Sequence, residues 1–219
     1  MRNINWDEEA IVESMRRLGN AERVIEYFKE PLEEIITPLL KGGGVPALES
    51  MDVAQVLIFI HINLLGYLYS GSDSTINAVK FLREYLGKVD SRYQEVGGLL
   101  YHLLRHGLIH RFIHKRLKLS NGTILGFRYT LDMNRAEHLK MVEIQGAKNL
   151  SISLWLLYDD LLSAIDLFAK DIRNNQELPD VFQRAFETRW ELDEENCLRK
   201  KKYDKDLDFI YGLLGQGSC

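Results

Sequence analysis

The chain has 219 residues, of which 46% are hydrophobic and 27% are charged, and its formal net charge is −4 at pH 7. This composition is typical of a soluble globular protein, and the negative net charge excludes a chain that coats nucleic acid non-specifically. The two cysteines, Cys197 and Cys219, are too few for a disulfide framework and indicate a reducing, cytoplasmic setting. The N-terminal sequence has no apolar signal core, so we expect no secretion signal.

The first part of the chain predicts a series of helices. Apolar residues recur at helical spacing from Asn5 to Gly19, and a second helix opens at Asn20. Pro31 predicts a kink or a new helix that runs to Leu40. Residues 42–46, GGGVP, predict a flexible connector rather than a phosphate loop, because the Lys-Ser/Thr that completes such a loop is missing.

A strongly apolar helix follows and is expected at the centre of a helical bundle. Ser50 or Asp52 is its predicted cap, and it runs to about Tyr69. Its apolar part, residues 53–68, is shorter than the roughly 20 apolar residues that a membrane span needs, so we expect no membrane contact. Ser74 predicts the cap of the next, amphipathic helix.

The stretch from Tyr101 to Lys118 is the one place where the chain puts cations inside a strongly apolar run. It belongs to a helix that Asp90-Ser91 starts and that continues to about His114. From Val96 to Leu131 there are six Lys or Arg residues and no Asp or Glu, so the charge is segregated. Burying cations among leucines is costly unless each finds a partner or lines a cavity, and the stretch is therefore the candidate functional site.

After this helix the periodicity changes from helical to strand-like. Two short apolar runs, Leu117–Leu119 and Ile124–Leu131, flank Asn121-Gly122, which supplies the positive φ values of a tight β-hairpin turn. His138–Ile144 predicts a third short strand. A long helix is expected from Ser151 to about Ile172.

The pattern as a whole predicts one mainly α domain over residues 1–219, a helical bundle with a small β-hairpin insert. The hairpin and short strand occupy residues 117–144, and the C-terminal helices occupy residues 151–214. The basic run 199–202 follows an acidic block and predicts a solvated surface rather than a nucleic-acid patch.

Arg105 and His110 are the candidate catalytic pair. Arg is a permanent cation with a forked donor that suits phosphate, and His can transfer protons near neutral pH. Together they suit a metal-free attack of an RNA 2′-hydroxyl on its own phosphate, in which His moves the proton and Arg stabilises the charge. The two side chains lie about 140° apart on an ideal helix, so a local adjustment at Gly107 or a second copy of the helix must bring them together.

The sequence from Arg105 to His110, RHGLIH, resembles the signature of the HEPN superfamily, an Arg and a His separated by four to six residues. His106 fits the polar residue that usually follows the Arg. The resemblance covers residues 50–116 and implies a HEPN-like helical bundle that pairs across a two-fold axis. It also implies a metal-independent endoribonuclease of a toxin–antitoxin, antiviral or RNA-processing system, with His110 as general acid or base, Arg105 as phosphate clamp and His106 as an orienting group.

Four residues around this pair are predicted to bind substrate: Tyr101, Arg111, Lys115 and Arg116. Tyr101 lies one turn before the Arg of the pair and is explained by packing as well as by substrate positioning. The expected partners are RNA, a second copy of the chain, and an antitoxin or another protein, and we assign no cofactor and no metal.

A binding module without catalytic activity is the alternative to the ribonuclease. The same cleft would hold RNA, a nucleotide or a partner protein, and the hairpin would extend the recognition surface. A packing role is a further alternative, in which Arg105 pairs with an acid such as Glu84 or Asp160 and His110 forms a hydrogen bond inside the core.

A stripe of histidines on the same helix leaves a metal site open as another interpretation. Two His residues at positions i and i+4 can chelate Zn²⁺ or Ni²⁺ from one helix face, and the chain has four at this spacing: His102, His106, His110 and His114. Four ligands along one helix cannot all reach one ion, so a complete site needs further ligands such as Glu84, Asp159 or His138.

The helix from Tyr101 to His114 is expected to pack against its own copy in a homodimer. One apolar flank of the helix fits the bundle, and a second apolar flank needs another surface to pack against. This second flank is formed by Leu99, Leu103, Ile109 and Ile113. A two-fold contact is the commonest way to supply such a surface, and it would bring two Arg105 and two His110 side chains to one cleft.

Overall fold

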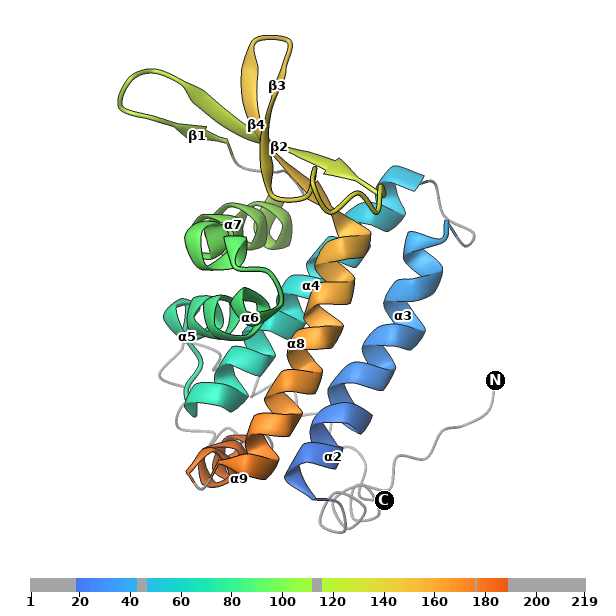
Figure 1. Cartoon of the computed structure of the whole chain (residues 1–219), viewed down its shortest axis with the longest axis vertical. Coiled ribbons are helices and arrows are strands. Elements are labelled where there is room, and N and C mark those ends of the chain that lie inside the picture. Colours follow the sequence, from blue (N-terminus) through green and yellow to red (C-terminus); the bar gives the residue numbers. More distant parts are fainter. Residues whose placement is uncertain (1–18, 43–46, 112–115, 176, 189–219) are drawn as a thin grey trace, which may run out of the picture. The chain divides into compact units, whose positions relative to one another are not determined.

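The computed structural model describes residues 19–42, 47–111, 116–175 and 177–188. These residues form a mainly α fold with a small four-stranded sheet, which confirms the predicted fold class (Figure 1). Contacts divide the chain into two compact units, Met1–Ala185 and Phe186–Cys219, and the fold described below is that of the first unit. The helices predicted from Asn5 and within the last residues, and the basic run 199–202, lie outside the described residues.

The N-terminal helical segment contains a π-helical turn directly before a proline. α2 (Asn20–Val24) continues into η1 (Ile25–Lys29) and then into α3 (Glu30–Leu40). Pro31 lies in the first turn of α3, where its missing N–H and its ring would disturb a regular α-helical ladder, and the wider π-turn accommodates both. The new helix predicted at this proline is confirmed, whereas Pro38 lies inside α3 without ending it at once.

The central helix begins earlier than predicted. α4 (Ala47–Ser70) already includes Ser50 and Asp52, so neither residue caps it, and the expectation of a cap there is wrong. The residues that precede Ser50 are Ala47, Leu48 and Glu49, and all three are strong helix formers.

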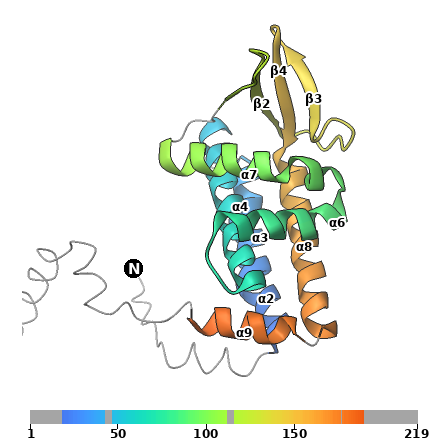
Figure 2. The ribbon, with the colours of Figure 1, turned by 90° about the vertical axis from the view of Figure 1, so that its left-hand side faces the viewer.

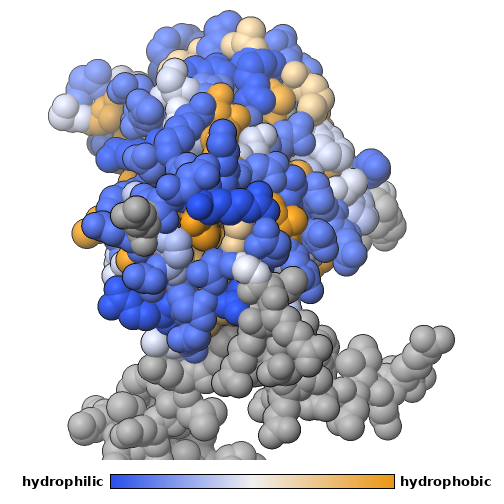
Figure 3. Space-filling view, turned by 60° about the horizontal axis from the view of Figure 1, so that its bottom comes forward, coloured by the Kyte–Doolittle hydropathy of each residue, from blue (hydrophilic) through white to orange (hydrophobic). Residues whose placement is uncertain are grey.

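By length and composition alone, the part of α4 from Ser50 to Ser70 could also cross a membrane. In the structure α4 contacts α3, α5, α7 and α8, and its buried side chains are those of a core helix: Ala54, Ile58, Phe59, Ile62, Leu65 and Leu68. The face of the molecule in Figure 3 is mostly hydrophilic, with apolar residues in small groups. Both observations are consistent with a soluble protein.

Two further helices form a closely packed pair. The first is one continuous segment made of α5 (Thr75–Phe81), η2 (Leu82–Leu86) and α6 (Gly87–Val89). Its predicted cap is confirmed, because the Oγ of Ser74 accepts a hydrogen bond from the N–H of Asn77 at 3.2 Å. α7 (Arg92–Arg111) follows, and the Asp90 carboxylate accepts from the N–H of Arg92, as expected for the start of this helix.

The sheet has four strands in the order β1-β2-β4-β3. β1 (Leu117–Lys118) and β2 (Ile124–Thr130) form the predicted antiparallel hairpin. Gly122 has a positive φ of 84° but Asn121 does not, and residues 119–123 join the strands, so the expected tight turn with positive φ at both residues is wrong. β3 (Lys140–Ile144) is the predicted third strand. β4 (Ala147–Ser153) pairs parallel with β2 and antiparallel with β3, and so holds the two hairpins together.

The long C-terminal helix does not begin at Ser151, and the prediction that it does is wrong. Residues 151–153 belong to β4, where buried Leu150 and Ile152 alternate with Ser151 and Ser153 at the period of a strand. α8 (Leu154–Asn174) begins only after them, and the Oγ of Ser153 caps it by accepting from the N–H of Leu156 at 3.2 Å. α9 (Leu178–Thr188) begins where Leu178-Pro179-Asp180 predicts it.

Phe168 of α8 lies at the centre of the aromatic core. Its ring contacts those of Phe81, Tyr85 and Phe182 with centroid distances of 5.5, 5.2 and 6.2 Å. α4 and α5 approach so closely beside this core that a Cβ at Gly66 would lie 2.6 Å from the Cα of Ala78. This packing fixes the positions of the helices against which α7 and the sheet pack.

Candidate nucleic-acid interface

α7 carries the candidate catalytic pair and lies between the sheet and the α5–α6 segment (Figure 2). The helix continues through Gly107 to Arg111 without a break, so this glycine does not provide the adjustment that would bring Arg105 and His110 together. On an unbroken helix these two positions stay about 140° apart. The side chains of residues 103–115, which include His106, Arg111 and Lys115, lie outside the described part of the structure, and their roles stay predictions.

Two glycines set the distance between α7 and the helix before it. A Cβ on Gly97 would lie 2.5 Å from the Cδ2 of Leu82, and one on Gly98 would lie 3.0 Å from the Nη2 of Arg83. The connection between the two helices is only Asp90-Ser91. The segment from Thr75 to Arg111 is therefore a tight antiparallel helix pair, in which α7 runs back along α5–α6 (Figure 2).

Tyr101 supports α7 from inside the bundle. Its side chain is fully buried, its hydroxyl donates to the Oδ1 of Asn63 at 2.6 Å, and its ring meets the edge of Phe59 at 6.1 Å. These contacts tie α7 to α4. Two roles were predicted for Tyr101, packing and substrate positioning. Its geometry fits packing.

The strand register places exposed cations on one face of the sheet, which we call the outer face. Lys118 pairs with Ile124 and Arg128 pairs with Ser151, so their side chains point to the same side. The opposite face carries Leu125, Leu150 and Ile152, which are buried. Neither Lys118 nor Arg128, nor Arg116 just before β1, forms an ion pair with any residue that the structure describes, and all three are exposed.

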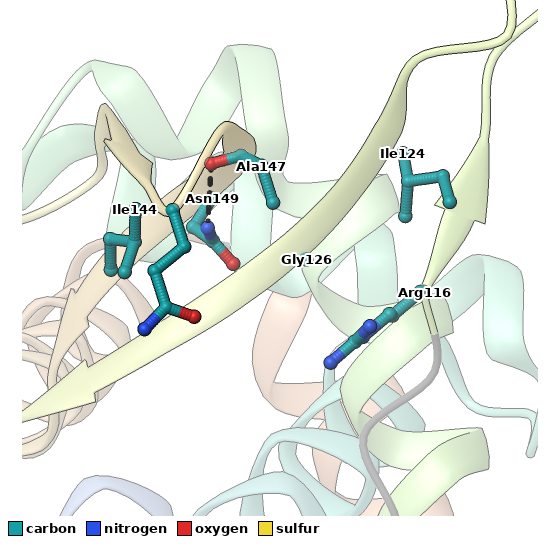
Figure 4. A pocket seen from close by; sticks show the side chains of 7 residues that line it. Arg116, Ile124, Gly126, Ile144, Ala147 and Asn149 are labelled. Atoms are coloured by element: carbon teal, nitrogen blue, oxygen red, sulfur yellow. Dashed lines mark hydrogen bonds between the residues drawn. The ribbon is translucent and has the colours of Figure 1, made fainter.

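A hollow of about 240 Å³ lies on the outer face (Figure 4). It is lined by Arg116 and by residues of three strands and one turn: Ile124, Gly126, Ile144, Gln145, Ala147 and Asn149. Arg116 is the only predicted substrate-binding residue among them. Sequence reasoning missed the others because strand pairing, not spacing along the chain, brings them together.

Beneath the sheet, a buried polar cluster joins the β insert to the helices. The Oδ2 of Asp160 on α8 accepts from the Tyr93 hydroxyl at 2.9 Å and from the Nη1 of Arg135 at 2.5 Å. Asp160 is 1% exposed, and its position between Leu157 and Leu161 on the apolar face of α8 is the sequence signal that could have identified it. Sequence reasoning considered Asp160 only as a partner of Arg105.

His138 completes this cluster as a neutral ring. Its Nδ1 accepts from the N–H of Ser153 at 3.0 Å, so the proton is on Nε2, which lies 2.8 Å from the Tyr93 oxygen. Burial, and secondly the charges of Arg135 and Arg92, lower the pKa of His138 to about 4. The hydrogen bonds therefore run in one direction, from Ser153 through His138 and Tyr93 to Asp160.

The described residues provide no set of ligands that would support a metal site on the histidine stripe. Within 19–42, 47–111, 116–175 and 177–188, no group of three or more His, Cys, Asp or Glu side chains is arranged to hold an ion. Of the predicted additional ligands, Glu84 lies 3.4 Å from Lys88, and His138 is enclosed in the cluster beside Asp160. The rest of the histidine stripe after His102 lies outside the described side chains.

Comparison with protein-family models, curated proteins and solved structures finds no match.

Proposed function

We propose that the protein binds duplex DNA without cleaving it, on a surface formed by α7 and the β1–β2 hairpin. The observation that carries the proposal is the distribution of charge on this supersecondary unit. All six cations of residues 96–131 belong to α7, the hairpin or the link between them, and no acid lies among them. Neutralising DNA phosphates is the main sequence-independent source of affinity for DNA.

The order of the elements supports a duplex as the ligand. A helix that lies in the major groove can carry the cations and polar groups that contact DNA, and α7 has 20 residues, about 30 Å, for this role. The β1–β2 hairpin follows it in the chain as a wing, and in this proposal Lys118 and Arg128 on its outer face would contact the backbone beside the groove. B-form DNA admits a helix in its major groove, whereas the major groove of A-form RNA is too narrow, and this favours DNA.

The exposed residues at the start of α7 suit base edges. Gln94 and Glu95 are exposed on the first turns, and His102 is exposed two turns later. Gln can form two hydrogen bonds with adenine, and a carboxylate can accept from the amino group of cytosine. In this proposal Glu95 and His102 would face bases near the start of α7, whereas the Gln94 side chain lies against Gly87 of α6, and the cations of α7 follow toward its other end.

The test is DNA binding measured by fluorescence anisotropy at several salt concentrations. Wild-type affinity for a mixed-sequence duplex should fall linearly with log salt. Lys118→Gln and Arg128→Gln should each weaken binding and reduce the magnitude of the salt slope by about one, because each removes one phosphate contact.

Lys170→Gln is the matched control for these variants. It makes the same change of charge at an exposed position of α8 and should leave both affinity and slope unchanged. Absence of duplex binding at 50 mM salt, or equal effects of all three substitutions, contradicts the proposal.

A HEPN-like ribonuclease that cleaves RNA through 2′-hydroxyl attack is the second candidate. The observation that favours it is that α7 runs as one helix through the whole RHGLIH motif in a mainly α fold. Because Arg105 and His110 lie about 140° apart on that helix, cleavage requires a homodimer in which each chain completes the other's site. An antitoxin or another protein partner belongs to this candidate.

RNA cleavage in EDTA separates the two candidates. The ribonuclease should cleave RNA without metal and lose cleavage in both Arg105→Ala and His110→Ala, and sedimentation should show a dimer at micromolar concentration. Intact RNA after incubation with a monomeric protein rules out this second candidate and leaves DNA binding untouched.

A further inference from the structure

We propose that the hollow on the outer face of the sheet binds a single nucleotide. The base would stand between Ile124 and Ile144, and the phosphate would bind Arg116. β3, β4 and the turn between them supply four of the seven described lining residues and contribute nothing to the proposed DNA surface, which shares Arg116 and the β2 residues with the hollow, so the inference goes beyond the proposed function.

The walls of the hollow form a slot of defined width. Ile144 pairs with Ala147. Leu125 pairs with Lys148 in the β2–β4 register, so the residues before them, Ile124 and Ala147, continue the same row across the sheet. The two isoleucines are separated by two strand spacings, about 9.6 Å between their backbones. Because the residue between them is alanine, an open slot is left between two apolar side chains that are 48% and 40% exposed.

The floor of the slot presents a fixed hydrogen-bond acceptor. The Nδ2 of Asn149 donates to the carbonyl of Ala147 at 2.9 Å, which fixes the orientation of the amide. Its Oδ1 lies over Gly126, where a Cβ would come within 2.6 Å of it. A larger residue at this position would have to displace the Asn149 amide, whose oxygen could accept from the amino groups that nucleobases carry on their edges.

The remaining polar groups select an anionic ligand. The guanidinium of Arg116 has no acidic partner among the described residues, and none of the described residues that line the hollow carries a carboxylate. A phosphate can accept two parallel hydrogen bonds from the N–H groups of a guanidinium. Apolar walls, an acceptor on the floor and a cation at the edge together fit a flat polar ring with a phosphate attached.

Gln145 is an unusual residue for its place in the backbone. It and Gly146 form the two-residue turn between β3 and β4, with φ values of 51° and 76°. Such turns favour Asn, Asp or Gly at both positions, because other side chains adopt positive φ at a cost. The longer side chain of Gln145 lines the hollow, where its amide can reach the ring.

Calorimetric titration with AMP, CMP, GMP and UMP, and with the matching nucleosides, tests the site. A nucleotide should bind about tenfold tighter than its nucleoside, and Arg116→Gln should abolish that difference, because it removes a charge-assisted hydrogen bond. Ile144→Ala should weaken nucleotide and nucleoside alike by opening the slot. Gln145→Asn should weaken binding without lowering the melting temperature, because Asn suits the turn better.

Lys170→Gln is again the control and should bind nucleotides as the wild type does. Binding of mononucleotides identifies a free nucleotide as the ligand. Binding of only a single-stranded oligonucleotide, with the same sensitivity to Ile144→Ala and Gln145→Asn, identifies a nucleotide within a strand. Either result supports the site. No binding of either probe at millimolar concentration, or no effect of these variants, overturns it. Duplex affinity of Ile144→Ala and Gln145→Asn, whose residues lie outside the proposed DNA surface, should stay at the wild-type value and so reports separately on that surface.

Discussion

Replacing Arg135 with Gln should lower the free energy of unfolding by about 3 kcal/mol, because the buried Asp160 carboxylate then loses the cation that compensates its charge. The side chain of Asp160 is 1% exposed and that of Arg135 is 45% exposed, so the cation is accessible to water but the anion is not. Arg135 also lies 3.7 Å from the carboxylate of Asp90, but Asp90 is paired with Arg92 as well. Loss of Arg135 therefore leaves the charge of Asp90 compensated and that of Asp160 not. Urea unfolding followed by far-UV circular dichroism measures the change.

Arg173→Gln is the matched control for this prediction. It removes the same kind of side chain from an ion pair of 2.8 Å with Glu22, but there both partners are about half exposed. Surface ion pairs contribute little, so this substitution should change the free energy of unfolding by less than about 1 kcal/mol. Equal losses in the two variants would show that burial of Asp160 does not matter.

The parts of the fold that the sequence predicts correctly are specified by local signals. Ser74 and Asp90 cap the helices that they were expected to cap, and Gly122 marks the connection of the predicted hairpin, although not as the tight turn that was expected. β4 was missed because its alternating residues run directly into the apolar face of α8, where the two periods overlap. Its parallel pairing with β2 is a contact between distant segments, and no local pattern encodes it.

The same distinction, between local sequence signals and contacts between distant segments, applies to the candidate sites. Segregation of charge along the chain identified the cations of α7 and the hairpin, because charge is visible in any sequence. The hollow was not visible, because Gly126, Gln145 and Asn149 meet only through strand pairing. The same holds for the polar cluster, in which Tyr93 is 45 residues from His138 and 67 residues from Asp160.

His138 gives this cluster a pH dependence that can be measured. In the unfolded chain its pKa has the ordinary value of 6.5, and in the folded protein it is lowered to about 4. Between these values the unfolded chain binds more protons than the folded protein, so acidification favours unfolding. The stability due to the neutral ring is complete above pH 6.5 and is lost as the pH falls toward 4.

The wild-type protein should therefore lose about 2 kcal/mol of stability from His138 alone between pH 7 and pH 5. His61, whose pKa burial also lowers, acts in the same direction in both wild type and variant and cancels in a comparison. The carboxyl groups with lowered pKa, such as Asp90, lose their contribution only at lower pH.

His138→Asn isolates the effect, because Asn keeps an acceptor for the N–H of Ser153 but does not titrate. The variant should be less stable at pH 7, since Tyr93 loses its donor, and the difference from wild type should shrink by about 2 kcal/mol by pH 5. A stability difference between wild type and His138→Asn that stays constant over this range would mean that His138 titrates alike in the folded and unfolded states, and that its place in the buried cluster does not hold it neutral.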